Sequence, residues 1–235
     1  KKSSKRLNLL NKKGFIKINK KSNLNKSKRI IDLVYSSSSK FLFANKYHKR
    51  LILSKSNLEE LVNLIFDKDL CHFLFSLTGY KYSIDFVGAY ENFYIPQKHQ
   101  KKSWYANHYH LDKPNSQNML KVFIPMADIG IDDGPLEVLS INQTKKYFST
   151  QKLNKNLEKF FMLGVLGDIF LCKLNLCMHK AGIPDMGKTT KLIMIQLNPS
   201  RNWFINSRLY KRQYLREPKF TSLGNQFVTR KEFII

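Results

Sequence analysis

Short runs of apolar, β-branched and aromatic residues follow one another after Gly79, and turn residues separate them. The runs are Tyr82–Val87, Tyr90–Ile95, Leu120–Met126, Leu136–Leu139, Ile169–Leu174 and Leu192–Leu197. Runs of this length and composition, bounded by Pro, Gly, Asn and Asp, predict β-strands. Because few helical patterns lie between them, we expect a sandwich or barrel of mainly β structure rather than a parallel sheet with alternating helices.

The helical patterns lie before Gly79. Apolar residues recur at positions 58, 61, 62, 65 and 66, which is the spacing of one helix face, and Ser56 or Asn57 can cap its start. A second helical pattern spans 69–77 and stops at Gly79. The sequence therefore predicts N-terminal helices over 55–79 and a β core over 82–198. Gly14 to Ile18 can add a short strand.

The net charge of +24 is concentrated at the two ends of the chain. Residues 1–30 hold 12 basic and no acidic residues, and residues 201–235 hold eight basic and two acidic ones. We expect a partly mobile basic leader over 1–30 and one domain over 31–235 that ends in a basic segment, 200–235. The charge suggests a polyanion partner. However, 33 lysines against only eight arginines are also typical of A/T-rich codons, and nucleic-acid binders favour Arg.

Several protein classes are excluded or made less favourable. No run approaches the roughly 18 apolar residues of a membrane span, and no apolar signal-peptide region is visible. Three cysteines without CxxC spacing argue against a disulfide framework and favour a reducing, cytoplasmic setting. No glycine-rich phosphate-binding loop is present.

The densest group of metal-binding residue types is the segment 107–112. His110 and Asp112 are two residues apart, so at a strand end both side chains point to one face. His179, which follows the last cysteine, is the best third ligand. Two histidines and one carboxylate form the facial triad of non-haem Fe(II) oxygenases. An HxD pair alone is weak evidence, because a histidine at a strand end is often only structural, and His108 can substitute as a ligand or lie behind the site.

The order of the motifs resembles the phytanoyl-CoA dioxygenase family of Fe(II)- and 2-oxoglutarate-dependent oxygenases. The resemblance runs from Gly14 to about Ser200. It rests on the segments Gly14–Ile16, Ser103–Asp112, Lys121–Asp128 with Asp133–Leu136, and Gly167–Phe170 with His179. It implies a double-stranded β-helix, a jelly-roll (cupin-like) fold flanked by N-terminal helices. It also implies Fe(II) held by His110, Asp112 and His179, with 2-oxoglutarate and molecular oxygen as co-substrates. The expected reaction is the hydroxylation of a small organic substrate or one of acyl or sugar type, and the positive charge of the chain favours an anionic one.

The resemblance also suggests which residues bind 2-oxoglutarate. The family usually places an Arg after the distal histidine to hold the far carboxylate, whereas this chain has Lys188 and Lys191 there. We expect Lys191 to take that role, although Lys188 lies near enough to compete. Lys121 can contact 2-oxoglutarate or an anionic substrate if it faces the interior, where it would need an acidic partner. The amides of Asn107 and Asn92 are further candidates for the carboxylates.

Other functions stay open at this point. Because the Arg expected after the distal histidine is missing, the chain can also be a non-catalytic jelly-roll binding protein. The positive charge is compatible with an oxygenase that acts on nucleic acid. However, such enzymes typically carry paired Arg after the distal histidine, and this chain has none there. Cys172 and Cys177 lie near His179, but no second ligand pair supports a zinc site. Trp203, Tyr210 and Tyr214 can form an aromatic and basic surface or a C-terminal helix that closes the barrel.

Overall fold

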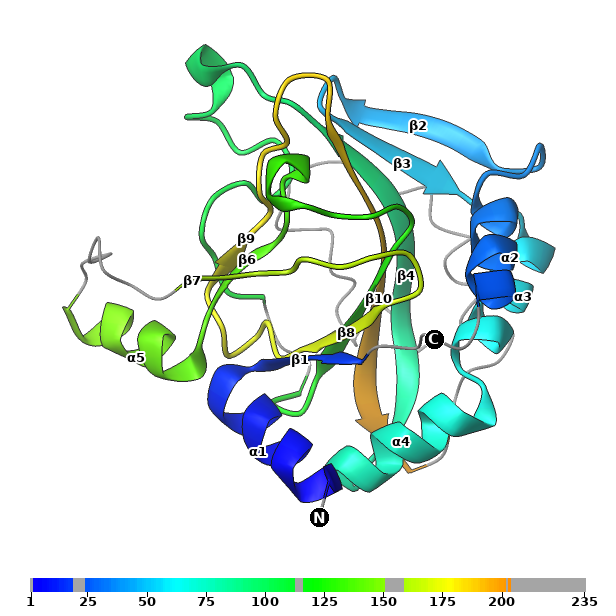
Figure 1. Cartoon of the computed structure of the whole chain (residues 1–235), viewed down its shortest axis with the longest axis vertical. Helices are drawn as coiled ribbons and strands as arrows, with labels where there is room; N and C mark the ends of the chain where they lie inside the picture. Colours follow the sequence, from blue (N-terminus) through cyan, green and yellow to red (C-terminus); the bar gives the residue numbers. More distant parts are fainter. Residues whose placement is uncertain (1, 19–23, 113–115, 151–158, 202, 204–235) are drawn as a thin grey trace, which may run out of the picture.

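The computed structural model describes residues 2–18, 24–112, 116–150, 159–201 and 203, and Figure 1 shows their arrangement. The helices are α1 (Lys2–Lys13), α2 (Leu24–Val34), α3 (Lys55–Ile65), α4 (Lys68–Thr78) and α5 (Ile141–Thr150). The strands are β1 (Phe15–Ile18), β2 (Lys40–Asn45), β3 (His48–Ile52), β4 (Lys81–Phe93), β5 (Leu120–Pro125), β6 (Glu137–Leu139), β7 (Lys159–Phe161), β8 (Ile169–Cys172), β9 (His179–Lys180) and β10 (Thr189–Ser200). Two short 3₁₀ turns cover Gln97–His99 and Ile131–Asp133.

Two antiparallel sheets form the centre of the molecule. The described strands of the larger sheet run in the order β1-β8-β5-β10-β4-β3-β2, and those of the smaller sheet in the order β7-β6-β9. In Figure 1 the helices α2, α3 and α4 lie on one side of the larger sheet, and the smaller sheet lies on the other side. The expectation of mainly β structure with flanking helices is confirmed.

Each face of the larger sheet packs in its own apolar core. On the face toward the helices, residues such as Ala89, Ile124 and Ile193 join Leu61 and Leu74 of α3 and α4. On the other face, a second core lies between the sheets and includes Phe123, Phe170, Leu192, Met194 and Val138. Because side chains alternate along a strand, neighbouring residues such as Leu192 and Ile193 belong to different cores.

The helix predictions before Gly79 are confirmed with a small shift. α3 begins two to three residues earlier than a cap at Ser56 or Asn57 would require, because the Ser54 side chain accepts the hydrogen bond from the Asn57 backbone N–H at 3.2 Å. α4 ends at Gly79 in the left-handed conformation (φ 75°), as expected.

The strand predictions are correct in position but not in extent. The two runs expected at Tyr82–Val87 and Tyr90–Ile95 form one long strand, β4, whose pairing with β10 runs from Phe93 to Lys81 with one irregularity at Gln196/Leu197. The strands β2 and β3 precede α3 and extend the larger sheet, so the sheet is not confined to the expected core of 82–198. The sequence analysis missed both strands because the first follows a serine run and the second is mostly basic.

The expectation of a leader separate from the domain does not hold for residues 2–18. The strand β1, predicted at Gly14 to Ile18, pairs with β8, and Leu10 of α1 is fully buried. Gly14 has a φ of 85°, and a Cβ at this position would lie 2.0 Å from the Cys177 sulfur. This close approach packs the turn after α1 against the segment that carries His179, because only glycine leaves the space.

Tyr210, Tyr214 and the rest of 204–235 lie outside the described residues, so the expected C-terminal helix or aromatic surface is not described. Within the residues that the structure describes, none of the helices is long and apolar enough to cross a membrane.

Candidate metal centre

His110 and His179 come from segments that lie antiparallel and adjacent. The backbone N–H of His110 donates to the His179 carbonyl at 3.0 Å, and the N–H of His179 donates to the His110 carbonyl at 3.0 Å. Two residues further on, the Asp112 N–H donates to the Leu174 carbonyl at 3.2 Å. In addition, His179 pairs with Val138 of the smaller sheet. These backbone contacts fix three polar side chains at one place.

The three side chains converge on one point. The Nε2 atoms of His110 and His179 lie 3.8 Å and 3.7 Å from Oδ1 of Asp112. The ligand atoms of all three residues lie within 4.8 Å of one another, and among the described residues no other such group of His, Cys, Asp or Glu is found. Two imidazoles and one carboxylate at this spacing can bind one cation from one side.

Both histidines are oriented to offer Nε2. The Nδ1–H of His110 donates to the His108 carbonyl, and the Nδ1–H of His179 donates to the Cys177 carbonyl, each at 2.9 Å. A neutral imidazole that donates through Nδ1 carries its lone pair on Nε2, so backbone carbonyls select the tautomer that can bind a metal. His108 itself is exposed and contributes only its carbonyl to this arrangement.

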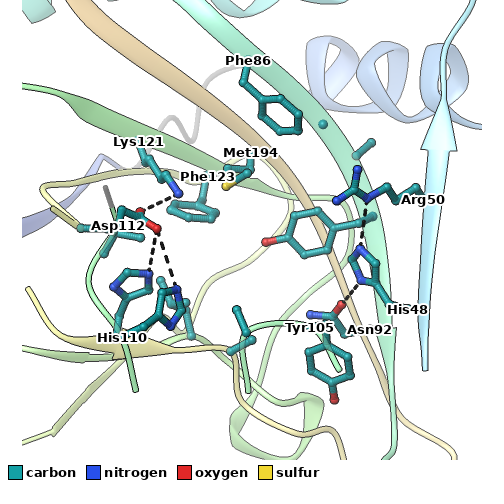
Figure 2. A pocket seen from close by; sticks show the side chains of 18 residues that line it. His48, Arg50, Phe86, Asn92, Tyr105, His110, Asp112, Lys121, Phe123 and Met194 are labelled. Carbon is teal, nitrogen blue, oxygen red and sulfur yellow. Dashed lines mark hydrogen bonds and ion pairs between the residues drawn. The ribbon is translucent and has the colours of Figure 1, made fainter. Parts of the chain in front are cut away.

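Asp112 and Lys121 form a buried ion pair behind the histidines. Their side chains are 0% and 2% exposed, and Lys121 Nζ lies 2.6 Å from Asp112 Oδ2 (Figure 2). The sequence-based expectation that an inward-facing Lys121 needs an acidic partner is therefore confirmed. The other carboxylate oxygen, Oδ1, is buried and receives no hydrogen bond from the part of the chain that the structure describes. A buried acceptor without a donor is costly, so a cation bound between Oδ1 and the two Nε2 atoms fits this site.

The charges of the site also suit a metal. Burial lowers the pKa of His179 to about 4, so this imidazole is neutral near pH 7 and can act as a ligand. Burial acts to raise the pKa of Asp112, but Lys121 and the two histidines outweigh it and hold the pKa below its ordinary value. Asp112 is therefore a carboxylate.

The triad opens into a pocket on the inner face of the larger sheet. The apolar part of its lining includes Phe86, Phe123, Leu136, Leu174 and Met194. Figure 2 shows Asp112, His110 and Lys121 on one side of this pocket and a second polar group on the opposite side. A pocket that is largely apolar, with polar groups at two places, is typical of small-molecule sites.

The second polar group comes from β3 and β4. His48 pairs with Asn92, and Arg50 with Tyr90, so all four residues share the face that lines the pocket. The His48 Nδ1–H donates to Asn92 Oδ1 at 2.7 Å, and the Arg50 Nε–H donates to His48 Nε2 at 3.4 Å. Burial is the main reason why the pKa of His48 falls to about 4, and the charge of Arg50 lowers it further.

Two of the residues expected to bind 2-oxoglutarate lie elsewhere. Lys191 faces the helices rather than the pocket, because Leu192 takes the pocket face of β10, and its Nζ lies 5.9 Å from the centre of the Tyr35 ring. The prediction of Lys191 as the carboxylate anchor is therefore wrong, and Lys188 is an exposed turn residue that does not line the pocket.

Asn107 is the second correction. Its side-chain oxygen accepts from the backbone N–H groups of Trp104 and Tyr105, and its amide nitrogen donates to the carbonyls of Gln100 and Lys102. The side chain therefore holds its own loop together and does not line the pocket. Asn92, by contrast, does line the pocket, in contact with His48.

Sequence reasoning missed Arg50 and Tyr90. Arg50 lies on a strand that was not predicted, and Tyr90 was noted only as a neighbour of Asn92. In the sequence, His48 and Arg50 are two residues apart, which places both side chains on one face of a strand. This spacing indicates a binding site only when the pairing of that strand with β4 is known.

Cys172 and Cys177 are buried, and neither belongs to the group of possible metal ligands, so the zinc alternative gains no support.

Comparisons with known proteins bear on the fold. No protein-family model matches the chain, and no curated protein matches it in sequence. Among solved structures, the non-haem α-ketoglutarate-dependent epimerase SnoN of nogalamycin biosynthesis has a TM-score of 0.61 at 9% identity, covering 84% of this chain and 81% of its own. A 2OG-Fe(II) oxygenase family oxidoreductase from Burkholderia pseudomallei has a TM-score of 0.59 at 12% identity, covering 87% and 94%.

A third similar structure was solved with ligands. HygX from Streptomyces hygroscopicus, with nickel, 2-oxoglutarate and hygromycin B bound, has a TM-score of 0.57 at 9% identity and covers 84% of this chain and 87% of its own. At these identities the likeness establishes the fold. The chain has the jelly-roll fold of 2-oxoglutarate-dependent oxygenases, as the sequence predicted, and function has to be argued from the site itself.

Proposed function

We propose that this protein is an Fe(II)- and 2-oxoglutarate-dependent dioxygenase, of the kind that the phytanoyl-CoA dioxygenase family represents. The observation that carries the proposal is the convergence of His110 Nε2, His179 Nε2 and the donorless Oδ1 of Asp112 within 4.8 Å. The fold, shared with oxygenases of this chemistry, agrees with the proposal but does not carry it.

His110, Asp112 and His179 would hold the iron, which supplies the activation of molecular oxygen when it is bound. In the overall reaction, 2-oxoglutarate and oxygen are converted to succinate and carbon dioxide, and the second oxygen atom enters a C–H bond of the substrate. A carboxylate ligand at Asp112 favours hydroxylation over halogenation, because halogenating relatives leave that ligand position open.

The chain's own residues position and shield these reactants. The backbone carbonyls of His108 and Cys177 keep both imidazoles in the tautomer that binds metal. Lys121 keeps Asp112 ionised and fixes one of its oxygens, so that the other faces the histidines. Phe123, Met194 and their apolar neighbours exclude water from the space beside the triad.

The substrate that we propose is a small organic molecule that fits this largely apolar pocket. The positive charge of the pocket residue Arg50 favours a ligand with a carboxylate group. We also propose that the protein acts in the cytoplasm, since its three cysteines are free in the structure.

An anaerobic titration tests the proposal. The purified protein is mixed with Fe(II) and then with 2-oxoglutarate, and the visible charge-transfer absorption of the keto acid on iron is recorded. We expect saturable absorption for the wild type, and at least about 100-fold weaker metal binding for His110→Ala and Asp112→Ala, since changes behind a metal ligand already cost 10- to 100-fold.

His108→Ala is the matched control, because His108 is an exposed histidine two residues before His110. It should bind iron and 2-oxoglutarate like the wild type. The absence of any absorption in the wild type, or its persistence in Asp112→Ala, would contradict the proposal and favour a non-catalytic jelly-roll protein.

A further inference from the structure

We infer that Arg50 of β3 binds the distal carboxylate of 2-oxoglutarate, in place of a cation on the strand after the distal histidine. The inference rests on the proposed function, since it takes 2-oxoglutarate as the ligand of the pocket. It assigns a co-substrate role to a residue two strands away from β10 in the sheet order β10-β4-β3.

The ligand carries two negative charges, and each needs a partner. 2-Oxoglutarate carries a carboxylate at each end, and its keto acid end chelates the metal. The distal carboxylate then lies in a pocket of largely apolar lining, where an ionised group needs a charged partner. A cation on the side of the pocket opposite the triad is therefore required.

Among the residues that the structure describes, two lysine or arginine side chains line the pocket, Lys121 and Arg50. Lys121 lies on the triad side, with its ammonium 2.6 Å from the Asp112 carboxylate. Arg50 lies on the opposite side, and its guanidinium is directed into the pocket (Figure 2). Lys191 is on the other face of the sheet. Position thus favours Arg50 as the partner of the distal carboxylate.

The surroundings of Arg50 orient its guanidinium. Asn92 holds His48 with Nδ1 protonated, and His48 Nε2 in turn accepts from Arg50 Nε. This bond restrains the plane of the guanidinium, whose terminal nitrogens form the fork that binds a carboxylate through two parallel hydrogen bonds. The low pKa of His48 keeps the imidazole neutral, so that it can accept this bond near pH 7.

Tyr90 links the two sides of the pocket. It pairs with Arg50 across β3 and β4, and its side chain lines the pocket. Burial raises the pKa of its phenol, the charge of Asp112 raises it further, and the charge of Arg50 lowers it. Because Tyr90, Arg50 and the triad residues all line the same pocket, the triad and Arg50 face one continuous space.

The test measures keto acid binding rather than turnover. Fe(II)-loaded protein is titrated anaerobically with 2-oxoglutarate and with 2-oxobutyrate, which has the same keto acid end but no distal carboxylate. For the wild type we expect much tighter binding of 2-oxoglutarate. In Arg50→Met its dissociation constant should rise by about 30- to 100-fold, whereas that of 2-oxobutyrate should change by less than about threefold.

Lys49→Met is the matched control. Lys49 is the preceding residue of the same strand, and its Nζ contacts Glu91 at 3.2 Å instead of lining the pocket. The Lys49→Met variant should keep the wild-type preference for 2-oxoglutarate over 2-oxobutyrate, and the Lys191→Met variant should keep it as well. Arg50→Lys retains the charge without the fork and should fall between wild type and Arg50→Met. If Arg50→Met does not fold, Arg50→Lys carries the test, and its preference for 2-oxoglutarate over 2-oxobutyrate should be weaker than that of the wild type.

The outcomes separate this inference from the proposed function. If the wild type binds neither iron nor either keto acid, the proposed function fails. If it binds both, but Arg50→Met and Arg50→Lys keep the wild-type preference, or Lys191→Met loses it, then the assignment of Arg50 is wrong while the oxygenase proposal stands. Equal weakening of both keto acids in Arg50→Met would mean that Arg50 only supports the pocket, which also overturns the assignment.

Discussion

The triad side of the pocket and the Arg50 side are built in different ways. His110, Asp112 and His179 come from short, irregular segments that two backbone hydrogen bonds hold together, and the three residues meet at one point. His48, Arg50, Tyr90 and Asn92 come from two regular neighbouring strands, and their positions follow from strand register. The first side suits a metal ion, which needs convergent atoms, and the second suits an extended anion, which needs a directed cation.

The largest expected difference between the two sides concerns buried charge. In metal-free protein, Lys121→Met leaves the buried Asp112 carboxylate without its cation and should lower the free energy of unfolding by about 3–5 kcal/mol. Arg50 is only half-buried, whereas Asp112 and Lys121 are fully buried, so Arg50→Met should cost less. Urea unfolding of the two variants measures the comparison.

Metal binding sharpens this prediction. Fe(II) or a redox-stable substitute such as Co(II) would supply positive charge beside Asp112, so saturating metal should restore part of the stability lost in Lys121→Met. A cost of Lys121→Met below that of Arg50→Met, or no recovery with metal, would show that the ion pair does not organise the triad side.

The two sides also differ in how far the sequence predicted them. The HxD spacing and the order of motifs were enough to select His110, Asp112 and His179 as candidate ligands, and the structure brings these three side chains together. Such a group can be selected from sequence because it depends on residue types and, for two of its members, on short spacing. Arg50 was missed because its partner Tyr90 is 40 positions away, and only the pairing of β3 with β4 brings the two together.

The misplacement of Lys191 has a similar cause. β10 reads Leu192, Ile193, Met194, Ile195, which is apolar on both faces, as in a strand that is covered on both sides. Such a run does not tell which alternate positions face the pocket, so position 191 could be assigned to either face. Asn107 was misjudged because its four backbone partners belong to an irregular loop. In contrast, the helices and most strands depend on local patterns and were predicted.

The next prediction concerns pH. Burial lowers the pKa of His48 from about 6.5 to about 4, so between these values the unfolded chain binds a proton that the folded chain does not. Stability should therefore fall as the pH is lowered from 6.5 toward 4, with His48 accounting for about 3 kcal/mol at the lower end.

The His48→Gln variant tests how much His48 contributes to the pH dependence of stability. Glutamine has a similar hydrogen-bonding capacity but carries no charge between pH 4 and 6.5. Unfolding of the metal-free protein by urea at several pH values should show a shallower decline in the variant than in the wild type. Because the pKa of His179 is also about 4, a decline should remain. Identical pH profiles would mean that His48 does not remain neutral in the folded protein.

The smallest expected effect lies in the loop between the two sides. Ala106 lines the pocket with a φ of 60°, the left-handed region that alanine adopts at a cost of about 1–2 kcal/mol. Its carbonyl accepts from the Ala181 N–H at 2.9 Å, which ties this loop to the segment just after His179. Ala106→Gly removes the strain but adds backbone freedom to the unfolded chain.

We expect the two effects to leave Ala106→Gly up to about 1 kcal/mol more stable than the wild type in thermal or urea unfolding. Ala181→Gly, in which the backbone bond is kept, is the control and should not be stabilised. A clear destabilisation of Ala106→Gly would argue against the left-handed conformation at this residue.

A crystal structure of the protein grown anaerobically with Fe(II) and 2-oxoglutarate would test directly whether the triad binds iron and Arg50 binds the co-substrate. We predict an anomalous iron peak within bonding distance of His110 Nε2, His179 Nε2 and an oxygen of Asp112. We also predict the distal carboxylate of 2-oxoglutarate on the guanidinium of Arg50. Iron at any other set of side chains, or no iron at all under saturating conditions, would contradict the account.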